Sequence, residues 1–178
     1  KGCSLNHGGK TNNYTVPNPK AQSKLIRKAL KKAHIEPTTL GNIEAHGTGT
    51  QLGDPIEITG LMRALKEYTV EMHKCPIGSV KSNIGHLESA AGIAAVTKVL
   101  LQMKYGKLVP SIHSDTLNPN IDFSQTPFYV QKKVEPWKGR RLAGISSFGA
   151  GGSNAPVILE EYSGKRVSPE HVDRRELV

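Results

Sequence analysis

The chain has 178 residues, of which 37% are hydrophobic and 22% are charged, so it is long enough for one domain with a real core. It contains no run of about eighteen apolar residues, which argues against a membrane span. The net charge of +9 favours an acidic partner or substrate, whereas an aromatic content of 5% and the lack of a groove-reading motif argue against nucleic acid.

The cysteines and the first residues indicate the setting of the chain. Cys3 and Cys75 form neither a disulfide framework nor a metal-binding spacing, so a reduced, cytoplasmic location is expected. The chain begins at Lys1 without an initiator Met or the apolar core of a signal peptide. It is therefore expected to be a piece of a longer protein.

The first half of the chain predicts alternating loops, helices and strands. Residues 1–19 are rich in Gly, Asn, Thr and Pro and predict a loop, with at most a short strand at its start. Apolar residues then recur four positions apart and predict a helix over 20–34. A short strand from Asn42 leads into a loop around His46.

A second helix is predicted by its start signal. Asp54 is a good N-cap residue, Pro55 suits the first helical position, and Glu57 completes a capping box. This helix is expected to run to about Tyr68, and the two acidic residues are assigned a structural role.

The second half predicts one long helix among several strands. The helix over 87–105 begins with small residues, which favours close packing, and Gly106 ends it. Residues 109–126 predict a surface loop, and Trp137 is expected to be a packing anchor. The charged tail over 163–178 predicts a linker or frayed end. Strands are predicted over 76–82, 128–130, 142–146 and 157–160.

Three loops at predicted strand ends are candidates for a functional site. The alternation predicts an α/β sheet flanked by helices, in which sites gather at strand ends. His46 and His86 each follow a strand and lie beside glycine, a pattern typical of a paired acid/base or oxyanion site. The third loop, over 147–154, is rich in glycine.

These loops resemble the β-ketoacyl synthases, and more narrowly the ketosynthase domain of modular polyketide synthases. The resemblance is carried by His46–Gly47–Thr48–Gly49–Thr50, Lys81–Ser82–Asn83–Ile84–Gly85–His86 and Ser147–Phe148–Gly149–Ala150–Gly151–Gly152–Ser153–Asn154. It covers residues 1–162 and implies the C-terminal half of a thiolase-like α/β fold, with a mixed five-stranded sheet flanked by helices. Ala150 and Ser153 resemble the bacterial branch whose acyltransferases act in trans.

The resemblance implies a decarboxylative Claisen condensation between an acyl thioester on cysteine and a malonyl unit on an acyl carrier protein. His46 and His86 would place N–H donors on the malonyl thioester carbonyl, and Lys81 would orient them with a fixed positive charge. Thr48 and Thr50 would bind the phosphopantetheine arm of the carrier protein. The loop residues Phe148, Gly149, Ala150 and Gly151 would form the pocket wall and an oxyanion-binding turn.

The same resemblance implies what this chain lacks and what it works with. The N-terminal half with the nucleophilic cysteine is not in the chain, so the isolated fragment is expected to be inactive. Neither Cys3 nor Cys75 matches that nucleophile. The implied partners are the acyl carrier protein, the N-terminal half and a second copy in a homodimer, with no metal and no cofactor bound directly. Pro156 stands where the family usually has histidine, and it favours a strand start or edge there.

Three alternatives remain open. A phosphate-binding module at 149–154 would lack the lysine of a P-loop and the dinucleotide spacing. A zinc site would use His46, His86 and Glu88. The two histidines lie forty positions apart, however, and no third ligand has a spacing that matches a zinc motif. A catalytically silent scaffold or a fragment that docks the carrier protein is the most serious alternative. Carrier docking is expected at one of two basic groups, represented by Lys28 with Lys32 or by Arg140 with Arg141.

Overall fold

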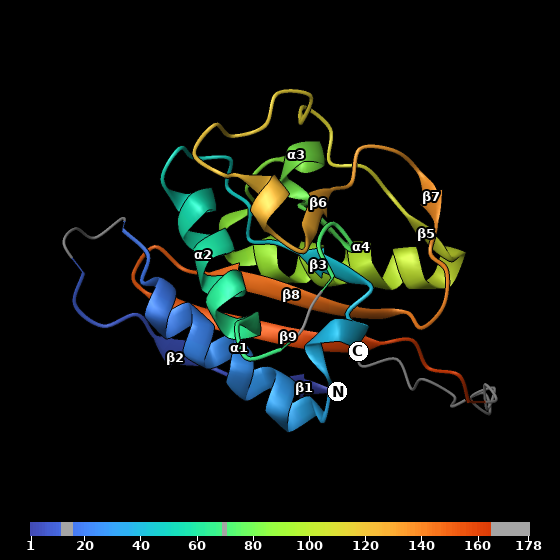
Figure 1. Cartoon of the computed structure of the whole chain (residues 1–178), viewed down its shortest axis with the longest axis horizontal. Helices are drawn as coiled ribbons and strands as arrows, with labels where there is room; N and C mark the ends of the chain where they lie inside the picture. Colours follow the sequence, from blue (N-terminus) through green and yellow to red (C-terminus); the bar gives the residue numbers. More distant parts are fainter. Residues whose placement is uncertain (12–15, 69–70, 165–178) are drawn as a thin grey trace, which may run out of the picture.

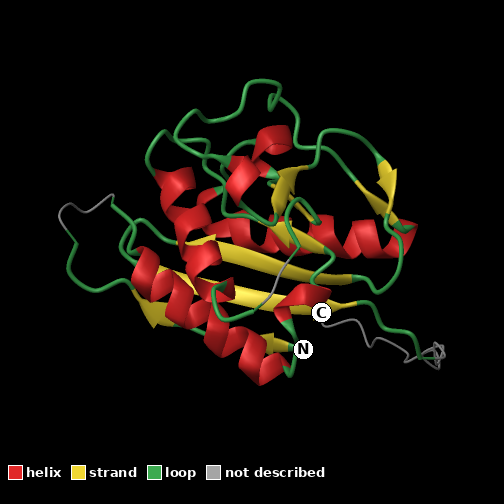
Figure 2. Cartoon of the chain, in the orientation of Figure 1, coloured by secondary structure: helices red, strands yellow, loops and turns green. Residues whose placement is uncertain are grey.

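The computed structural model describes residues 1–11, 16–68 and 71–164. Within these residues a central sheet is covered by helices on both faces (Figures 1 and 2). The helices are α1 (Pro19–Ala33), α2 (Gly53–Leu65), α3 (Lys81–Ile84) and α4 (Ala91–Tyr105), with 3₁₀ turns η1 (Pro37–Thr39), η2 (Glu88–Ala90) and η3 (Phe123–Gln125). The strands are β1 (Gly2–Cys3), β2 (Asn6–His7), β3 (Asn42–Glu44), β4 (Cys75–Gly78), β5 (Lys107–Leu108), β6 (Phe128–Val130), β7 (Glu135–Pro136), β8 (Leu142–Phe148) and β9 (Ser153–Glu160).

The sheet confirms the mixed α/β prediction, with more strands than expected. Among the described residues, seven strands pair in the order β1-β9-β8-β3-β4-β6, and β2 also pairs with β9. Strands β8, β3, β4 and β6 are parallel, and β9 is antiparallel to β8. The five longer strands match the implied sheet. The two additional strands come from residues 1–19, because the backbone at Gly2–Cys3 and Asn6–His7 pairs along the outer edge of β9.

Helix α1 shows why the first helical pattern succeeds. The side chain of Asn18 accepts hydrogen bonds from the N–H groups of Lys20 and Ala21, so Asn18 is the N-cap and Pro19 occupies the first turn. His34 ends the helix in the left-handed conformation, with φ of 54°. The prediction of residues 20–34 is therefore one residue late at each end.

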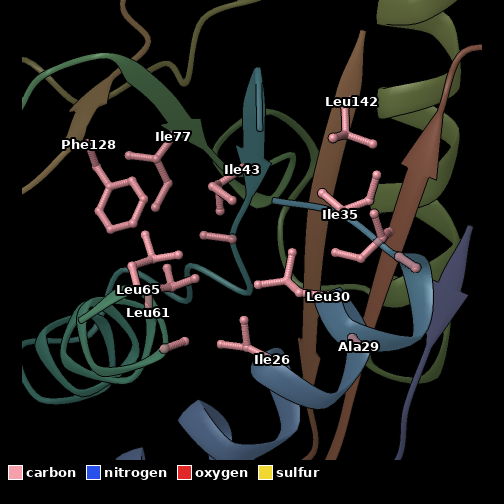
Figure 3. Close-up of a cluster of buried hydrophobic side chains, with 14 of the residues drawn as sticks. Ile26, Ala29, Leu30, Ile35, Ile43, Leu61, Leu65, Ile77, Phe128 and Leu142 are labelled. Carbon is pink, nitrogen blue, oxygen red and sulfur yellow. The ribbon is translucent and has the colours of Figure 1, made fainter. Parts of the chain in front are cut away.

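The larger core lies between the sheet and the pair α1 and α2. Leu30 of α1 and Leu61 of α2 face Ile43 of β3, Phe128 of β6 and Leu142 of β8 (Figure 3). Each of these side chains is buried. This cluster holds β3 and β4 in place from one face, and those strands lead directly into the histidine loops.

Helix α4 covers the opposite face of the sheet. Val99 and Met103 pack against Ala143 and Ile145 of β8, which alternate with Leu142 along the strand. Trp137 is only 4% exposed in this second cluster, which confirms its prediction as a packing anchor.

The other side of α4 is apolar and uncovered in the described residues. Ile93 and Tyr105 are 64% and 65% exposed, and a groove of about 620 Å³ runs along this side. Leu101 of α4 lines it, together with Ile84 and Leu87 from the segment before the helix. An exposed apolar face of this kind marks an interaction surface.

Two predicted elements have different boundaries in the structure. The strand predicted over 76–82 ends at Gly78, and residues 81–84 form the helical turn α3. The cause is tertiary: the N–H of Ser79 donates to the Ser111 hydroxyl and that of Val80 donates to the Glu44 carboxylate, so neither joins a strand. The helix predicted from residue 87 begins at Ala91 after η2, because Glu88 has a left-handed φ of 48°.

Pro156 lies inside β9, rather than at a strand start or an edge. Its carbonyl accepts the N–H of Ser4, so this residue's backbone faces the side where β1 and β2 pair. Residues 4 and 5 interrupt that pairing, between Cys3 opposite Val157 and Asn6 opposite Asn154. The donor that proline lacks therefore falls at a break in the ladder, which explains why the strand tolerates it.

Two further expectations concern the chain as a whole. From residue 165 onward, the tail predicted over 163–178 lies outside the described residues. Among the residues that are described, no helix combines the length and the hydropathy needed to cross a bilayer.

Candidate active site

Three loops meet at one edge of the sheet. The loop with His46 follows β3, the loop with Lys81 and His86 follows β4, and the turn at 149–152 follows β8. Because these three strands are parallel, their carboxyl ends lie at the same edge. The topology thus brings together histidines that are forty positions apart in sequence.

The two imidazole rings face each other edge to face. Their centroids are 5.4 Å apart with an interplanar angle of 81°. The Phe148 ring lies 5.6 Å from the His46 ring on another side. His46 is half-buried and His86 is exposed. The two rings therefore lie next to each other, and a ligand can approach them from solvent on the side of His86.

Backbone donors set the tautomer of both rings. The N–H of Phe148 donates to Nδ1 of His46 at 3.3 Å, and the N–H of Glu88 donates to Nδ1 of His86 at 3.0 Å. A neutral imidazole that accepts at Nδ1 carries its hydrogen on Nε2. Neither Nε2 has a hydrogen-bond partner among the residues the structure describes, so both N–H groups can donate to a ligand.

His46 is held neutral by its surroundings. Burial, the positive charge of Lys81 and the neighbouring His86 together lower the pKa of His46 to about 4. At neutral pH this ring is therefore a hydrogen-bond donor at Nε2 without a positive charge.

Lys81 lies close enough to His46 to influence its ring electrostatically. It occupies the first turn of α3, and burial lowers its pKa while Glu57 and Glu44 raise it. Its ammonium group has no hydrogen bond to another described residue. The side chain supplies a positive charge beside the neutral ring of His46.

The Glu57 side chain binds the backbone of the His46 loop and does not form the predicted capping box. Its Oε1 accepts the N–H of His46 and its Oε2 accepts that of Gly47, each at 2.9 Å. Burial raises the pKa of Glu57 to about 7, although the same two hydrogen bonds oppose the rise. The structural role assigned to this residue is right, but it concerns the histidine loop instead of its own helix.

Asp54 is likewise not an N-cap. Helix α2 begins at Gly53, one residue before the predicted cap, and ends at Leu65 instead of about Tyr68. The Asp54 carboxylate accepts the N–H of Gly49 at 3.1 Å. Both acidic side chains therefore turn back onto the 46–50 loop, because its backbone donors lack strand partners and lie over the start of α2.

The two threonines of this loop lie at its exposed end. Thr48 and Thr50 have their hydroxyl oxygens 3.3 Å apart, and Thr50 Oγ1 accepts the N–H of Gly53 at 3.0 Å. Asn118, from the long loop after β5, donates to the Thr50 carbonyl at 3.4 Å. This arrangement presents two adjacent hydroxyls to solvent on a braced backbone.

The glycine-rich turn is shorter than predicted, since β8 and β9 extend to Phe148 and Ser153. The N–H of Gly149 donates to the Ser153 carbonyl at 2.7 Å, which closes the turn. The N–H groups of Ala150 and Gly151 have no partner among the described residues, so they can bind an oxyanion.

His7 is a site support that the sequence interpretation missed. Its Nδ1 accepts the N–H of Gly9, and its Nε2 therefore donates to the Gly151 carbonyl at 2.7 Å. The ring lies against Gly152, where a Cβ would approach it to 2.9 Å and where φ is 95°. The only sequence signal was a histidine in a glycine- and asparagine-rich start, which predicts no contact with residue 151.

The zinc alternative finds no supporting cluster in the structure. Within residues 1–11, 16–68 and 71–164, no group of three or more His, Cys, Asp and Glu side chains could hold a metal ion. Glu88 contributes its backbone N–H to His86.

Comparison with known proteins identifies the family. Residues 1–115 match the family described as "Beta-ketoacyl synthase, C-terminal domain", and residues 118–178 match "Ketoacyl-synthetase C-terminal extension". Polyketide synthase PksL of Bacillus subtilis (strain 168) is 57% identical over 98% of this chain, which spans 4% of that protein. Polyketide synthase ThaG of Burkholderia thailandensis is 61% identical over 89% of this chain and 3% of its own length.

Solved structures agree. The oxazolomycin ketosynthase domain OzmH KS7 of Streptomyces albus JA3453 superimposes with a TM-score of 0.88 at 56% identity, over 90% of this chain and 29% of that one. The ketosynthase from module 6 of the bacillaene synthase of Bacillus subtilis 168 gives a TM-score of 0.88 at 43% identity, over 92% and 30% of the two chains. The chain thus spans under a third of a solved ketosynthase. It belongs to the β-ketoacyl synthases, a family of condensing, acyl-transferring enzymes, as the C-terminal part of a modular polyketide synthase ketosynthase domain.

Proposed function

We propose that this chain supplies the two-histidine part of a ketosynthase active site, which catalyses the decarboxylation of a malonyl thioester and the condensation that follows. The carrying observation is the pair of rings 5.4 Å apart, each with Nδ1 occupied by a backbone donor and each with Nε2–H free to donate. Two such donors can bind the same thioester oxygen.

The chemistry follows from where the charge develops. The bond between the malonyl carboxylate carbon and the α-carbon breaks, carbon dioxide leaves, and the electron pair becomes an enolate whose oxygen carries the negative charge. His46 and His86 stabilise that oxygen through their Nε2–H groups, and Lys81 adds a positive charge nearby. The enolate carbon then attacks the acyl thioester, forming the new carbon–carbon bond and releasing the cysteine thiolate of the N-terminal half.

The remaining site residues fit the two thioesters. The hydroxyls of Thr48 and Thr50 suit the amides of the phosphopantetheine arm that a carrier protein presents. The free N–H of Ala150, between Gly149 and Gly151, suits the oxyanion of the acyl thioester, and Phe148 forms a wall beside His46. The presence of both histidines favours an elongating module, and the Bacillus relatives are consistent with the branch served by acyltransferases in trans.

The N-terminal half of the ketosynthase is the proposed occupant of the exposed face of α4. The chain spans 29–30% of the two solved ketosynthase chains, so a larger part of the domain is available to cover Ile93, Leu101 and Tyr105. We also propose that the ketosynthase domain ends at residue 162 and that a tail follows over 163–178. The complete domain is proposed to form homodimers and to work in the cytoplasm.

Complementation tests the proposed function. The isolated chain is expected to form no condensation product from an acyl donor and a malonyl-carrier thioester, because the acyl-bearing cysteine and the cover of α4 are lacking. Addition of the N-terminal half is expected to restore condensation, measured by mass spectrometry of the carrier-bound product. Condensation by the isolated chain, or a reconstituted domain in which His46→Ala has no effect, would contradict the proposal.

Carrier docking is better placed on α1 than at the other basic group. Arg140 is paired with Glu160 and Arg141 with Glu161, so these charges are largely satisfied within the chain. A hollow between α1 and α2 is lined by Ser23 and by the cations Lys20, Lys24, Arg27, Arg63 and Lys66. Arg27 pairs with Glu67, whereas the other four cations have no ion pair among the described residues. We propose that an acidic carrier-protein surface binds there and extends over Lys28.

Charge reversal of both Lys24 and Lys28 in the complete ketosynthase is therefore expected to weaken carrier binding about tenfold at low salt, and less as salt screens the attraction. Isothermal titration against the carrier protein measures the change. The control is charge reversal at Arg140 and Arg141, which should have a smaller effect. A loss in the control alone would move the docking site to that loop, and no loss in either would place it elsewhere.

A further inference from the structure

A buried ion pair lies directly behind the two-histidine site. Glu44, the last residue of β3, is fully buried two positions before His46. Its Oε2 is 2.6 Å from Nζ of Lys98 on α4, and the Lys98 side chain is only 10% exposed. The pair therefore joins the middle of the sheet to the helix that covers its opposite face.

The same carboxylate has a second partner. Its Oε1 accepts the N–H of Val80 at 2.6 Å. Val80 immediately precedes the loop that carries Lys81 and His86, and that loop ends at α4. One side chain on the His46 strand thus binds the start of the His86 loop through the Val80 N–H, and binds the middle of the helix that follows the loop through Lys98.

Stability alone gives a poor reason for this arrangement. Removing a carboxylate and an ammonium group from water is costly, and apolar replacements of buried pairs are often neutral or stabilising. Burial raises the pKa of Glu44, and Lys98 opposes that rise. Lys98 therefore helps keep the carboxylate ionised, and the ionised group can hold both of its partners.

The chemistry of the site gives a better reason. Both Nε2–H groups must reach about 2.7–3.1 Å from one developing oxyanion. A misplacement of about 1 Å can cost roughly a hundredfold in rate. Because the histidines come from separate loops, their separation depends on whatever joins β3 to the segment between β4 and α4.

We propose that the Glu44–Lys98 pair is a positioning element that sets the relative placement of the His46 and His86 rings. This inference rests on the proposed function, since it concerns how the two donors come to share one oxygen. It assigns no contact with substrate to either residue.

The test uses the complete ketosynthase and follows two half-reactions separately. Lys98→Met is expected to lower malonyl decarboxylation at least tenfold, while transfer of an acyl group onto the cysteine stays within twofold of wild type. Lys98→Arg retains the ion pair and is expected to recover most of the lost rate. The matched control is Lys74→Met, because Lys74 pairs with Glu71 on the exposed surface.

Coupling to the histidines separates positioning from a general loss of stability. In a His86→Ala background, Lys98→Met is expected to cost less than twofold further, because the donor pair is already broken. A full additional tenfold loss in that background would overturn the inference. So would an equal loss in both half-reactions.

A second variant covers the case in which Lys98→Met does not fold. Glu44→Gln retains the side-chain length and can still accept the Val80 N–H, but it loses the ionic bond to Lys98. A tenfold slower decarboxylation with normal acylation supports the inference, and unchanged decarboxylation overturns it. If His46→Ala and His86→Ala themselves leave decarboxylation intact, the proposed function fails as well, which distinguishes the two failures.

Discussion

Replacing His46 by alanine in the complete ketosynthase is expected to slow carbon dioxide release from a malonyl-carrier thioester by ~10²–10³-fold, the usual loss when one oxyanion donor is removed. The reason is the neutral Nε2–H of His46, which the Phe148 N–H fixes by donating to Nδ1. Single-turnover conversion of malonyl-carrier to acetyl-carrier, followed by mass spectrometry, measures the rate.

The partner histidine and a matched control sharpen this result. His86→Ala is expected to cause a loss of similar size, and the double variant less than the product of the two, because both donors serve one oxygen. His113 is exposed in the loop after β5 with φ of 58°, so His113→Asn tests a histidine outside the site without straining the backbone. Decarboxylation at the wild-type rate in His46→Ala would contradict the two-donor mechanism, as would equal loss of cysteine acylation.

Replacing Glu57 by glutamine is expected to alter how stability depends on pH. The pKa of Glu57 is about 7 in the folded protein against an ordinary value of 4.5. Between these values the folded state binds a proton that the unfolded chain has released, so this carboxyl favours folding less as pH rises from 4.5 to 7. The free energy of unfolding of Glu57→Gln, minus that of wild type, should therefore rise by up to about 1.4 kcal/mol per pH unit across this window.

In the wild-type protein, the titration of His46 changes the free energy of unfolding with pH in the direction opposite to that of Glu57. Its pKa is about 4 when folded and 6.5 ordinarily, so between these values the unfolded chain binds the extra proton and stability rises with pH. From about pH 4.5 to 6.5 the two contributions act against each other, and Glu57→Gln exposes the histidine contribution. We expect the wild-type curve to be flatter than that of the variant.

Urea denaturation at four pH values from 4.5 to 7.5 gives the required differences. Glu36→Gln is the control for the replacement of an exposed glutamate, because Glu36 lies on the surface before η1. A pH-independent difference for Glu57→Gln would show that its carboxyl titrates normally and that the loop does not depend on a buried acid.

The candidate site residues were easier to predict from the sequence than the residues that support their loops, because the two groups differ in their local sequence pattern. His46, His86 and the glycine-rich turn have unusual composition at strand ends, and parallel strands bring such ends together. Glu57 and Asp54 matched a helix start so well that local spacing predicted capping. Their carboxylates instead bind loop N–H groups that come from eleven and five positions earlier.

The boundaries that were misjudged have a common origin. Residues 79–82 were predicted to continue a strand, yet the N–H groups of Ser79 and Val80 are taken by Ser111 and Glu44, which lie far away in sequence. Pro156 argues locally against a central strand, and only the interruption between β1 and β2 shows why β9 accepts it. Local propensity cannot register a partner that arrives from another part of the chain.

The sequence by itself determined the α/β class and the main helices and strands, and it indicated the candidate site residues, because hydrophobic periodicity and side-chain type are local properties. Only the tertiary structure decided that the two imidazole rings lie 5.4 Å apart, which tautomer each ring has, and which carboxylates support the His46 loop. Those properties depend on distances between segments tens of residues apart. Such distances are set by strand order and by burial on both faces of the sheet.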